Sequence, residues 1–281
     1  MMNFELVRIA IAVALTGVAA YEDAKTSYVS DRVLYAMIAA GLLLDVAAGL
    51  GFFLSVLPFA LVIALGGFIL WKRGSFGQGD VWLFLGLQLL LPSYPSFAQT
   101  SLPGFPFTAS VFLASSFFST IGAGAFYASG LFKVKNFFER SKVKLVALVA
   151  VVFAVSWFVS MLSLGVLAKA FFVLFSACAL FFAFFFTEIK EKLLVKFVPL
   201  SQVDDEDVLV VELMPETLLK QYSLGRVVTK NEFEKLKKIV KGGRMKRFPI
   251  LKNLIRFNPY VLLGLLACLY AGDLLLWLLF Q

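Results

Sequence analysis

The stretch Gly77-Gln78-Gly79-Asp80-Val81-Trp82-Leu83-Phe84-Leu85 places a carboxylate where a glycine turn meets an apolar helix. An ionisable side chain costs roughly 2.5–3.5 kcal/mol near a bilayer centre and less toward its edge, so it is usually paired, solvated or functional. Gly77 and Gly79 permit a close backbone approach and conformations that other residues avoid. Asp is also a good N-cap, which gives Asp80 a purely structural alternative. A functional role therefore needs a second carboxylate at the same depth.

The composition is that of a membrane protein. Of the 281 residues, 60% are apolar and 32 are Phe, and the mean hydropathy is +0.89. A soluble domain is nearer half apolar. We therefore expect an all-α, polytopic membrane protein.

The chain has no histidine and only 2 cysteines. The missing histidine excludes Ser-His-Asp and Cys-His catalysis and the H-E-x-x-H zinc site. Cys178 and Cys268 both lie in apolar runs, where packing is their simplest role, and they provide no disulfide framework or zinc ribbon. We expect no metal and no cofactor.

Apolar runs divide the chain into about eight spans that can cross a bilayer of ~30 Å. The expected spans are Phe4–Ala20, Val33–Gly51, Phe53–Trp71, Val81–Ala98, Thr108–Phe132, Val143–Leu164, Val166–Phe186 and Pro259–Phe280. Residues 1–186 would form a membrane core, residues 187–257 a small α+β cytosolic module, and residues 258–281 a final transmembrane helix. Because Val18-Ala19-Ala20 resembles a signal-peptidase site, a cleaved signal peptide is the alternative for the first run.

Basic residues are confined to alternate connections between the spans. All lysines and arginines except Arg8 and Lys169 fall in residues 21–32, 72–80, 133–144 and 187–257. The positive-inside rule makes these four segments cytoplasmic and puts both termini outside. Topology thus accounts for the net charge of +8, and we expect no nucleic-acid partner.

The same topology supplies the second carboxylate. Glu22, Asp23 and Asp80 would lie at one depth, at the cytoplasmic ends of the first and fourth spans. Two carboxylates close together tend to share a proton, so one can act as a base toward water while the other donates to a scissile carbonyl. This chemistry needs neither histidine nor a metal. In the alternative, Asp23 only binds loop backbone and Asp80 only caps a helix.

These residues resemble the motifs of the archaeal type IV prepilin and preflagellin (archaellin) peptidases, which are GxGD-type membrane aspartyl peptidases. Asp23-Ala-Lys-Thr-Ser-Tyr-Val-Ser-Asp31 is similar to their first aspartate motif and Gly77-Gln-Gly-Asp80 to their second. Phe105-Pro-Phe107 and the carboxy-terminal region around Gly272-Asp273 also resemble archaeal members. The resemblance implies an endopeptidase that removes a short basic leader from pilin-like or archaellin precursors at the cytoplasmic face. Asp23 and Asp80 match its catalytic pair, and the missing C-x-x-C motif gives no reason to expect methyltransferase activity.

The other acidic residues have structural alternatives. Glu22 does not match the motif and is treated as a neighbour, whereas Asp31 is expected to cap the following helix. Recognition of a basic leader is a second possible role for both. Asp45 and Asp273 lie deep in spans, where we expect either an ion-pair partner or a water-filled cavity. Arg8 and Lys169, the two basic residues within spans, are the candidate partners.

The polar segment 187–257 is expected to fold before the last span. Val208-Leu-Val-Val211 reads as a buried strand, and Thr229-Lys-Asn-Glu232 has the spacing of a capping box before an amphipathic helix. Its basic residues are expected to meet anionic membrane lipids, with substrate docking as the alternative.

An ion-coupled transporter or channel that uses the intramembrane carboxylates is the alternative function from another class. Such transporters show internal repeats and carboxylates at the midplane. The sequence has no convincing repeat, and its best carboxylate pair is expected at one surface. A non-catalytic assembly protein is a third possibility.

Overall fold

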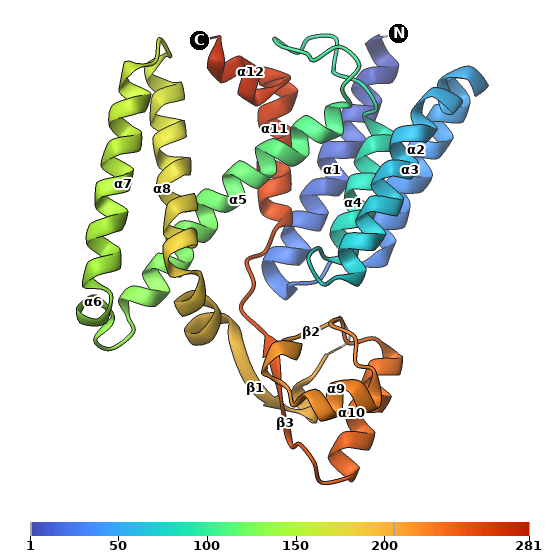
Figure 1. The fold of residues 1–281 in the computed structure, drawn as a ribbon. Helices are drawn as coiled ribbons and strands as arrows, with labels where there is room; N and C mark the ends of the chain where they lie inside the picture. Colours follow the sequence, from blue (N-terminus) through green and yellow to red (C-terminus); the bar gives the residue numbers. More distant parts are fainter. Residues whose placement is uncertain (1, 205, 281) are drawn as a thin grey trace.

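The structure, a computed structural model, describes residues 2–204 and 206–280, so Met1, Asp205 and Gln281 of the expected ranges lie outside it. Within the described residues, five helices are long and apolar enough to cross a membrane: Phe4–Thr26, Leu50–Lys72, Phe107–Phe132, Lys142–Met161 and Val166–Leu194. The chain is therefore a mostly helical, multi-pass membrane protein, as its composition indicates. Figure 1 places both termini at one end of these helices and a small sheet beyond the other end.

The helices are α1 (Met2–Thr26), α2 (Asp31–Ala48), α3 (Leu50–Lys72), α4 (Gln78–Leu90), α5 (Phe107–Phe132), α6 (Phe137–Arg140), α7 (Lys142–Met161), α8 (Val166–Ile189), α9 (Glu216–Tyr222), α10 (Lys230–Lys241), α11 (Asn258–Ala271) and α12 (Leu274–Leu279). The strands are β1 (Val195–Pro199), β2 (Val208–Leu209) and β3 (Arg247–Leu251), and a π-helical turn, η1 (Lys190–Leu194), continues α8. Two 3₁₀ turns, η2 (Leu200–Gln202) and η3 (Val211–Leu213), complete the regular structure.

One core joins helices from distant parts of the sequence. α2 lies along α4, and α11 packs against both α1 and α5 (Figure 1). Glycines permit the close contact of α2 with α4, because a Cβ at Gly41 would lie 2.5 Å from Leu89 Cβ and one at Gly86 would lie 2.8 Å from Met37 Cβ. The buried cluster formed this way includes residues of α1, α2, α4, α5, α8 and α11. α1 is thus an integral part of the core.

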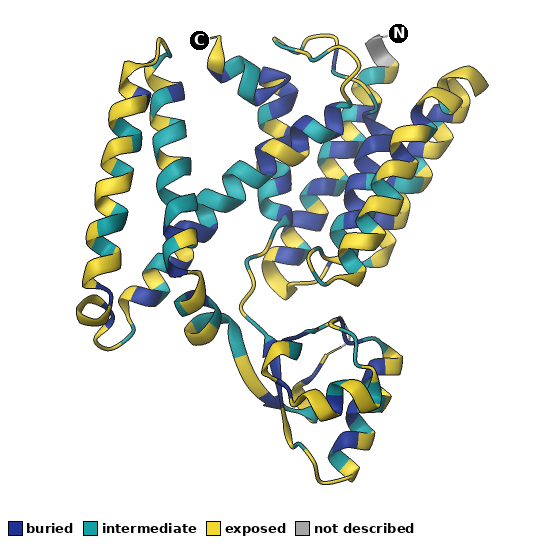
Figure 2. Cartoon of the chain, in the orientation of Figure 1, coloured by how far each residue is buried: buried dark blue, intermediate teal, exposed yellow. Residues whose placement is uncertain are grey.

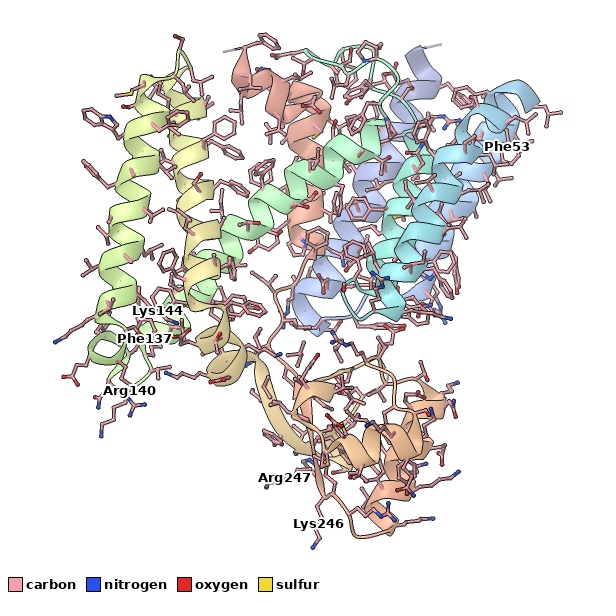
Figure 3. All side chains as sticks on the ribbon, in the orientation of Figure 1. Phe53, Phe137, Arg140, Lys144, Lys246 and Arg247 are labelled. Atoms are coloured by element: carbon pink, nitrogen blue, oxygen red, sulfur yellow. The ribbon has the colours of Figure 1, made fainter. Side chains whose placement is uncertain are left out.

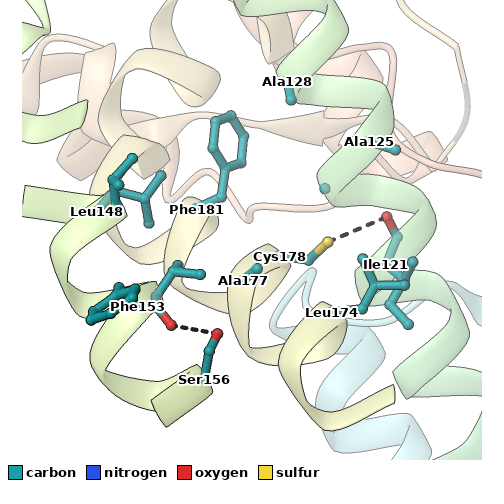
Figure 4. Close-up of a pocket in the computed structure, with 13 residues that line it drawn as sticks. Ile121, Ala125, Ala128, Leu148, Phe153, Ser156, Leu174, Ala177, Cys178 and Phe181 are labelled. Carbon is teal, nitrogen blue, oxygen red and sulfur yellow. Dashed lines mark hydrogen bonds between the residues drawn. The ribbon is translucent and has the colours of Figure 1, made fainter. Parts of the chain in front are cut away.

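The α7–α8 hairpin stands to one side of this core and packs on it through α5 (Figure 1). Most of α7 is exposed or half-buried although its sequence is apolar, as expected of a helix that faces lipid (Figure 2). A cavity of about 560 Å³ opens between α5, α7 and α8 (Figure 4). Its lining is apolar except for Ser156 and Cys178 and includes no carboxylate, so it offers no acid–base chemistry.

The segment before α11 folds around its own apolar cluster. The three strands form an antiparallel sheet in the order β1-β3-β2, with Val195 paired to Leu251 and Val208 to the same residue on the other side. The capping position is confirmed, since the Thr229 side chain accepts a hydrogen bond from the backbone N–H of Glu232. The apolar face of α10 also packs on the sheet as its sequence indicates. We call residues 195–251 the module.

Three expected boundaries differ from the structure, each for a local reason. α1 continues through Thr26, because the first residue with a left-handed backbone is Ser27, at φ 61°. α4 ends at Leu90, ahead of two prolines, so residues 92–106 are not helical and the fourth span is short. The last span is broken at Gly272, whose φ is +83°, and α12 restarts after it.

The intramembrane charges have definite partners. Arg8 donates to Asp45 at 2.7 Å and also to the carbonyl oxygens of Leu89 and Leu90. Asp273 accepts hydrogen bonds from the Ser110 hydroxyl and, as the N-cap of α12, from the backbone N–H of Leu276. Arg8 is therefore the basic residue that pairs with Asp45, and Asp273 has a structural role at the start of α12.

Removing only one partner of the ion pair should strongly destabilise the fold. Arg8→Leu or Asp45→Leu alone leaves the other charge buried, so each should lower the free energy of unfolding by about 3–5 kcal/mol. The double variant removes both charges and should recover much of that loss. Denaturation in detergent, compared across the three variants, measures this, and a double variant as unstable as the sum of the singles would contradict it.

The orientation in the membrane can be measured by labelling. Ser75 and Ser93 are exposed and lie in connections at opposite ends of α4. In a chain with Cys178→Ala and Cys268→Ala, we expect Ser75→Cys to react with an impermeant thiol reagent only from the cytoplasm. Ser93→Cys should react only from outside. Reaction of both from one side would overturn the topology.

Candidate active site

Asp23 lies in the last turn of α1 and is held by the start of α11. Its side chain is buried, and its Oδ2 accepts a hydrogen bond of 3.0 Å from the backbone N–H of Asn258. The Arg256 guanidinium lies close enough to attract the carboxylate. Asp23 therefore binds backbone at the far end of the sequence rather than its own loop.

Asp80 lies in the first turn of α4, where its carboxylate folds back over Gly77. A Cβ at Gly77 would lie 2.8 Å from Asp80 Oδ2, which is closer than a carbon and an oxygen can pack. Gly77 has φ −71° and ψ 144°, so it is needed for space and not for an unusual backbone. Gly79 is less constrained, since its nearest contact would be Leu34 Cδ1 at 3.9 Å. The N-cap is Gly77, and the Asp80 carboxylate also accepts a hydrogen bond from the Gly77 backbone N–H, so Asp80 helps to start the helix as the third residue of a capping box does.

The two aspartates are brought together at one end of the helices. The charge on Asp23 acts on Asp80, and the side-chain amide of Asn258 lies against both carboxylates. Two carboxyl groups coupled in this way tend to share a proton, and a pair of this kind can supply both the base and the acid for chemistry on a peptide bond.

A group of phenylalanine rings keeps the two helix starts side by side. Phe76 precedes the glycine turn, and its ring lies 6.0 Å from that of Phe257, which precedes Asn258. Phe84 on α4 and Phe112 on α5 complete the group at 5.4 Å from each other. Aromatic pairs at such distances stabilise by about 0.5–1.5 kcal/mol each beyond their burial. The packing therefore fixes Asn258 beside Asp80.

The module approaches the loops that carry the aspartates. Val208 and Val227 of the module lie near the turn at Gly74. Arg256, which lies between the module and α11, donates to the Ser27 hydroxyl at 3.1 Å. Burial and the carboxylates of Asp31 and Glu206 raise the pKa of the Tyr28 phenol. The module and the α1–α2 loop thus face each other at the end of the helices where the aspartates lie (Figure 1).

The two other acidic residues of the first motif lie apart from the pair. Glu22 accepts hydrogen bonds from the backbone N–H and the hydroxyl of Ser30, at 2.7 and 3.1 Å, which closes the α1–α2 loop. Asp31 is exposed and is the first residue of α2, with Ser30 as the N-cap, so the expectation that Asp31 caps the helix is wrong. Its charge still suits the first turn of a helix.

Metal ligands are not gathered here. Across residues 2–204 and 206–280, no three His, Cys, Asp or Glu side chains are placed to hold a metal ion.

Figure 3 places Lys246 and Arg247 at the end of the module farthest from the helices, so these two residues do not support the expected lipid contact.

The fold is that of a multi-pass membrane protein in which two buried carboxylates meet at one end of the helices. Residues 10–124 match the type IV leader peptidase family, and this range includes Asp23, Gly77 and Asp80. This amino-terminal region is therefore similar to that family. It is also 35% identical over 117 residues to the prepilin peptidase EppA of Methanothermobacter thermautotrophicus, over 39% of this chain and 30% of that protein. No solved structure matches the chain.

Asn258 is the site residue that the sequence did not reveal. It lies outside the matched range and in the polar end of the last expected span. One signal was present: the expected topology puts residue 258 at the same membrane face as both aspartates. A buried asparagine at that depth needs a polar partner.

Proposed function

We propose that this chain is a membrane aspartyl endopeptidase that removes short basic leaders from prepilin-like or archaellin precursors. The observation that carries the proposal is the meeting of Asp23 and Asp80, from two helices, inside the region that matches the leader peptidase family. The aligned relative is a prepilin peptidase, although the alignment spans only 30% of it. Gly77 serves the site by leaving room for the Asp80 carboxylate.

The pair would hydrolyse the peptide bond through an activated water. The ionised carboxylate takes a proton from the water, whose oxygen attacks the carbonyl carbon while the protonated carboxyl gives its proton to the carbonyl oxygen. The tetrahedral intermediate then breaks its C–N bond. The leaving nitrogen receives a proton from the first carboxyl, and the second regains one from the intermediate's hydroxyl. No metal or cofactor takes part.

The site would work at the cytoplasmic face. Four basic segments connect helices at the same end as the aspartates, and the positive-inside rule assigns that end to the cytoplasm. An apolar helix of the precursor would lie among membrane lipids and present its leader at this depth. Asp31, which is exposed, and Glu206 both act on Tyr28, so negative charge gathers where a basic leader would enter. Glu22 is a weaker candidate for this role because Ser30 already occupies its carboxylate.

A transporter is the less favoured function. Its ion path would need carboxylates available within the membrane, but Asp45 is paired with Arg8 and Asp273 is engaged by Ser110. Both carboxylates are therefore engaged in structural contacts and are not free to bind an ion.

The central test is the loss of precursor cleavage in Asp23→Asn and Asp80→Asn. The amide has nearly the same shape but neither accepts a proton from water nor supplies one, so each variant should lose at least ~100-fold in rate. The full chain is assayed in membranes with a designed precursor, whose short leader ends in Lys before an apolar helix of about 20 residues. Cleavage is measured by mass spectrometry.

The controls separate catalysis from folding. Glu22→Gln and Asp31→Asn should keep most of the activity, and the double aspartate variant should be hardly slower than either single one, since the pair acts as a unit. A leader with Glu in place of Lys should be cleaved more slowly. Normal cleavage by Asp80→Asn, or no cleavage by the unmodified chain, would contradict the proposal.

The two glycines of the motif should differ sharply. Gly77→Ala puts a methyl group where the Asp80 carboxylate lies and should reduce cleavage about tenfold or more, equivalent to ~1.4 kcal/mol of lost transition-state stabilisation. Gly79→Ala meets only ordinary contacts and should cost less than a few-fold. The same cleavage assay measures both, and equal losses would mean that Gly77 acts through helix formation alone.

A further inference from the structure

Asn258 is buried at the junction between the module and the last helices. It is 4% exposed, and its Oδ1 has no hydrogen-bond partner among the described residues. The side-chain amide lies against Asp23 and Asp80, while the backbone N–H donates to Asp23 only. Buried polar groups are nearly always hydrogen-bonded, so the free Oδ1 needs an explanation.

The start of α11 directs its positive charge at Asp23 and not at Asp80. The first N–H groups of a helix have no partner within it and carry a partial positive charge. One of these, on Asn258, points at Asp23, and Pro259 follows without an N–H of its own. Arg256 adds a positive charge on the same side. The Asn258 N–H and the Arg256 charge both favour the ionised form of Asp23, and neither of them acts on Asp80.

We propose that Asn258 is a positioning residue of the aspartate pair, which holds Asp23 as the base toward water and leaves the shared proton on Asp80. This inference rests on the proposed function for its meaning in catalysis. The side-chain amide of Asn258 holds the two carboxylates in position relative to each other. Its backbone N–H stabilises the ionised form of Asp23.

The placement of Asn258 does not depend on one contact. The Phe76–Phe257 ring pair and the contact of Arg256 with Ser27 hold the residues on either side of it. The backbone at Asn258 is therefore fixed without its side chain. Replacing the side chain tests its interaction with the carboxylates more than it tests the fold.

The experiment uses the full chain in detergent and two readouts. Asn258→Leu removes the amide at similar size. Thr16→Val is the matched control, because Thr16 is also fully buried in α1 with an unpartnered hydroxyl but is not a part of the site. The first readout is the pH dependence of cleavage of the designed precursor. The second is the infrared band of the protonated carboxyl, followed through a pH titration without substrate.

Asn258→Leu removes a hydrogen bond to a charged group, and the strength of such a bond predicts the sizes of the change in rate and of the shift in pH dependence. Asn258→Leu should cleave roughly 10- to 100-fold more slowly at neutral pH. Its pH optimum and its carboxyl band should both move up by about one to two pH units, because the ionised pair has lost a donor. Thr16→Val should change neither readout. The band should vanish in Asp80→Asn and persist in Asp23→Asn.

Each outcome bears on the proposal separately from the peptidase activity. An unchanged pH optimum and band in Asn258→Leu, with a rate like the control, would overturn the positioning role while leaving the peptidase intact. A band that vanishes in Asp23→Asn instead would overturn the assignment of the proton. Expected infrared shifts without any cleavage by the unmodified chain would support the arrangement and refute the proposed function. If the leucine variant does not fold, Asn258→Ala carries the same expectations.

Discussion

The absence of water around apolar helices is the constraint on which this structure depends. A charged side chain in that environment needs a partner, and each buried aspartate of this structure has a different kind of partner. Arg8 neutralises Asp45, and Ser110 and a helix start satisfy Asp273. Asp80 is the exception, because its charged neighbour is another carboxylate. The proposed function rests on this unfavourable pairing.

The site is built from three regions that are far apart in the sequence. α1 and α4 contribute the aspartates, and α11 contributes Asn258 from outside the range that matches the leader peptidase family. Phenylalanines at the start of α4 and before α11 hold these regions together through ring contacts. The amino-terminal region therefore carries the family motifs, while the carboxy-terminal region completes their surroundings.

Much of the fold follows from local pattern. Apolar runs predict the membrane helices, and the alternation of basic connections predicts that both aspartates lie at one end. The errors come from interactions that the pattern does not show: Ser27 rather than polarity ends α1, and prolines end α4 early. Asn258 was missed because its contact with Asp23 joins residues 235 positions apart. Local propensity does not encode such a contact, and the choice of Arg8 over Lys169 as the partner of Asp45 was hidden for the same reason.

The position of Asn258 also sets an order of events during synthesis. A ribosome delivers the helix that bears Asp80 to the membrane long before it makes residue 258, so the nascent chain holds both carboxylates without the backbone group that Asp23 binds in the finished fold. Insertion of α11 between α1 and α5 is then the step that completes the site. Under the proposed function, hydrolytic competence would begin only when translation has passed the module.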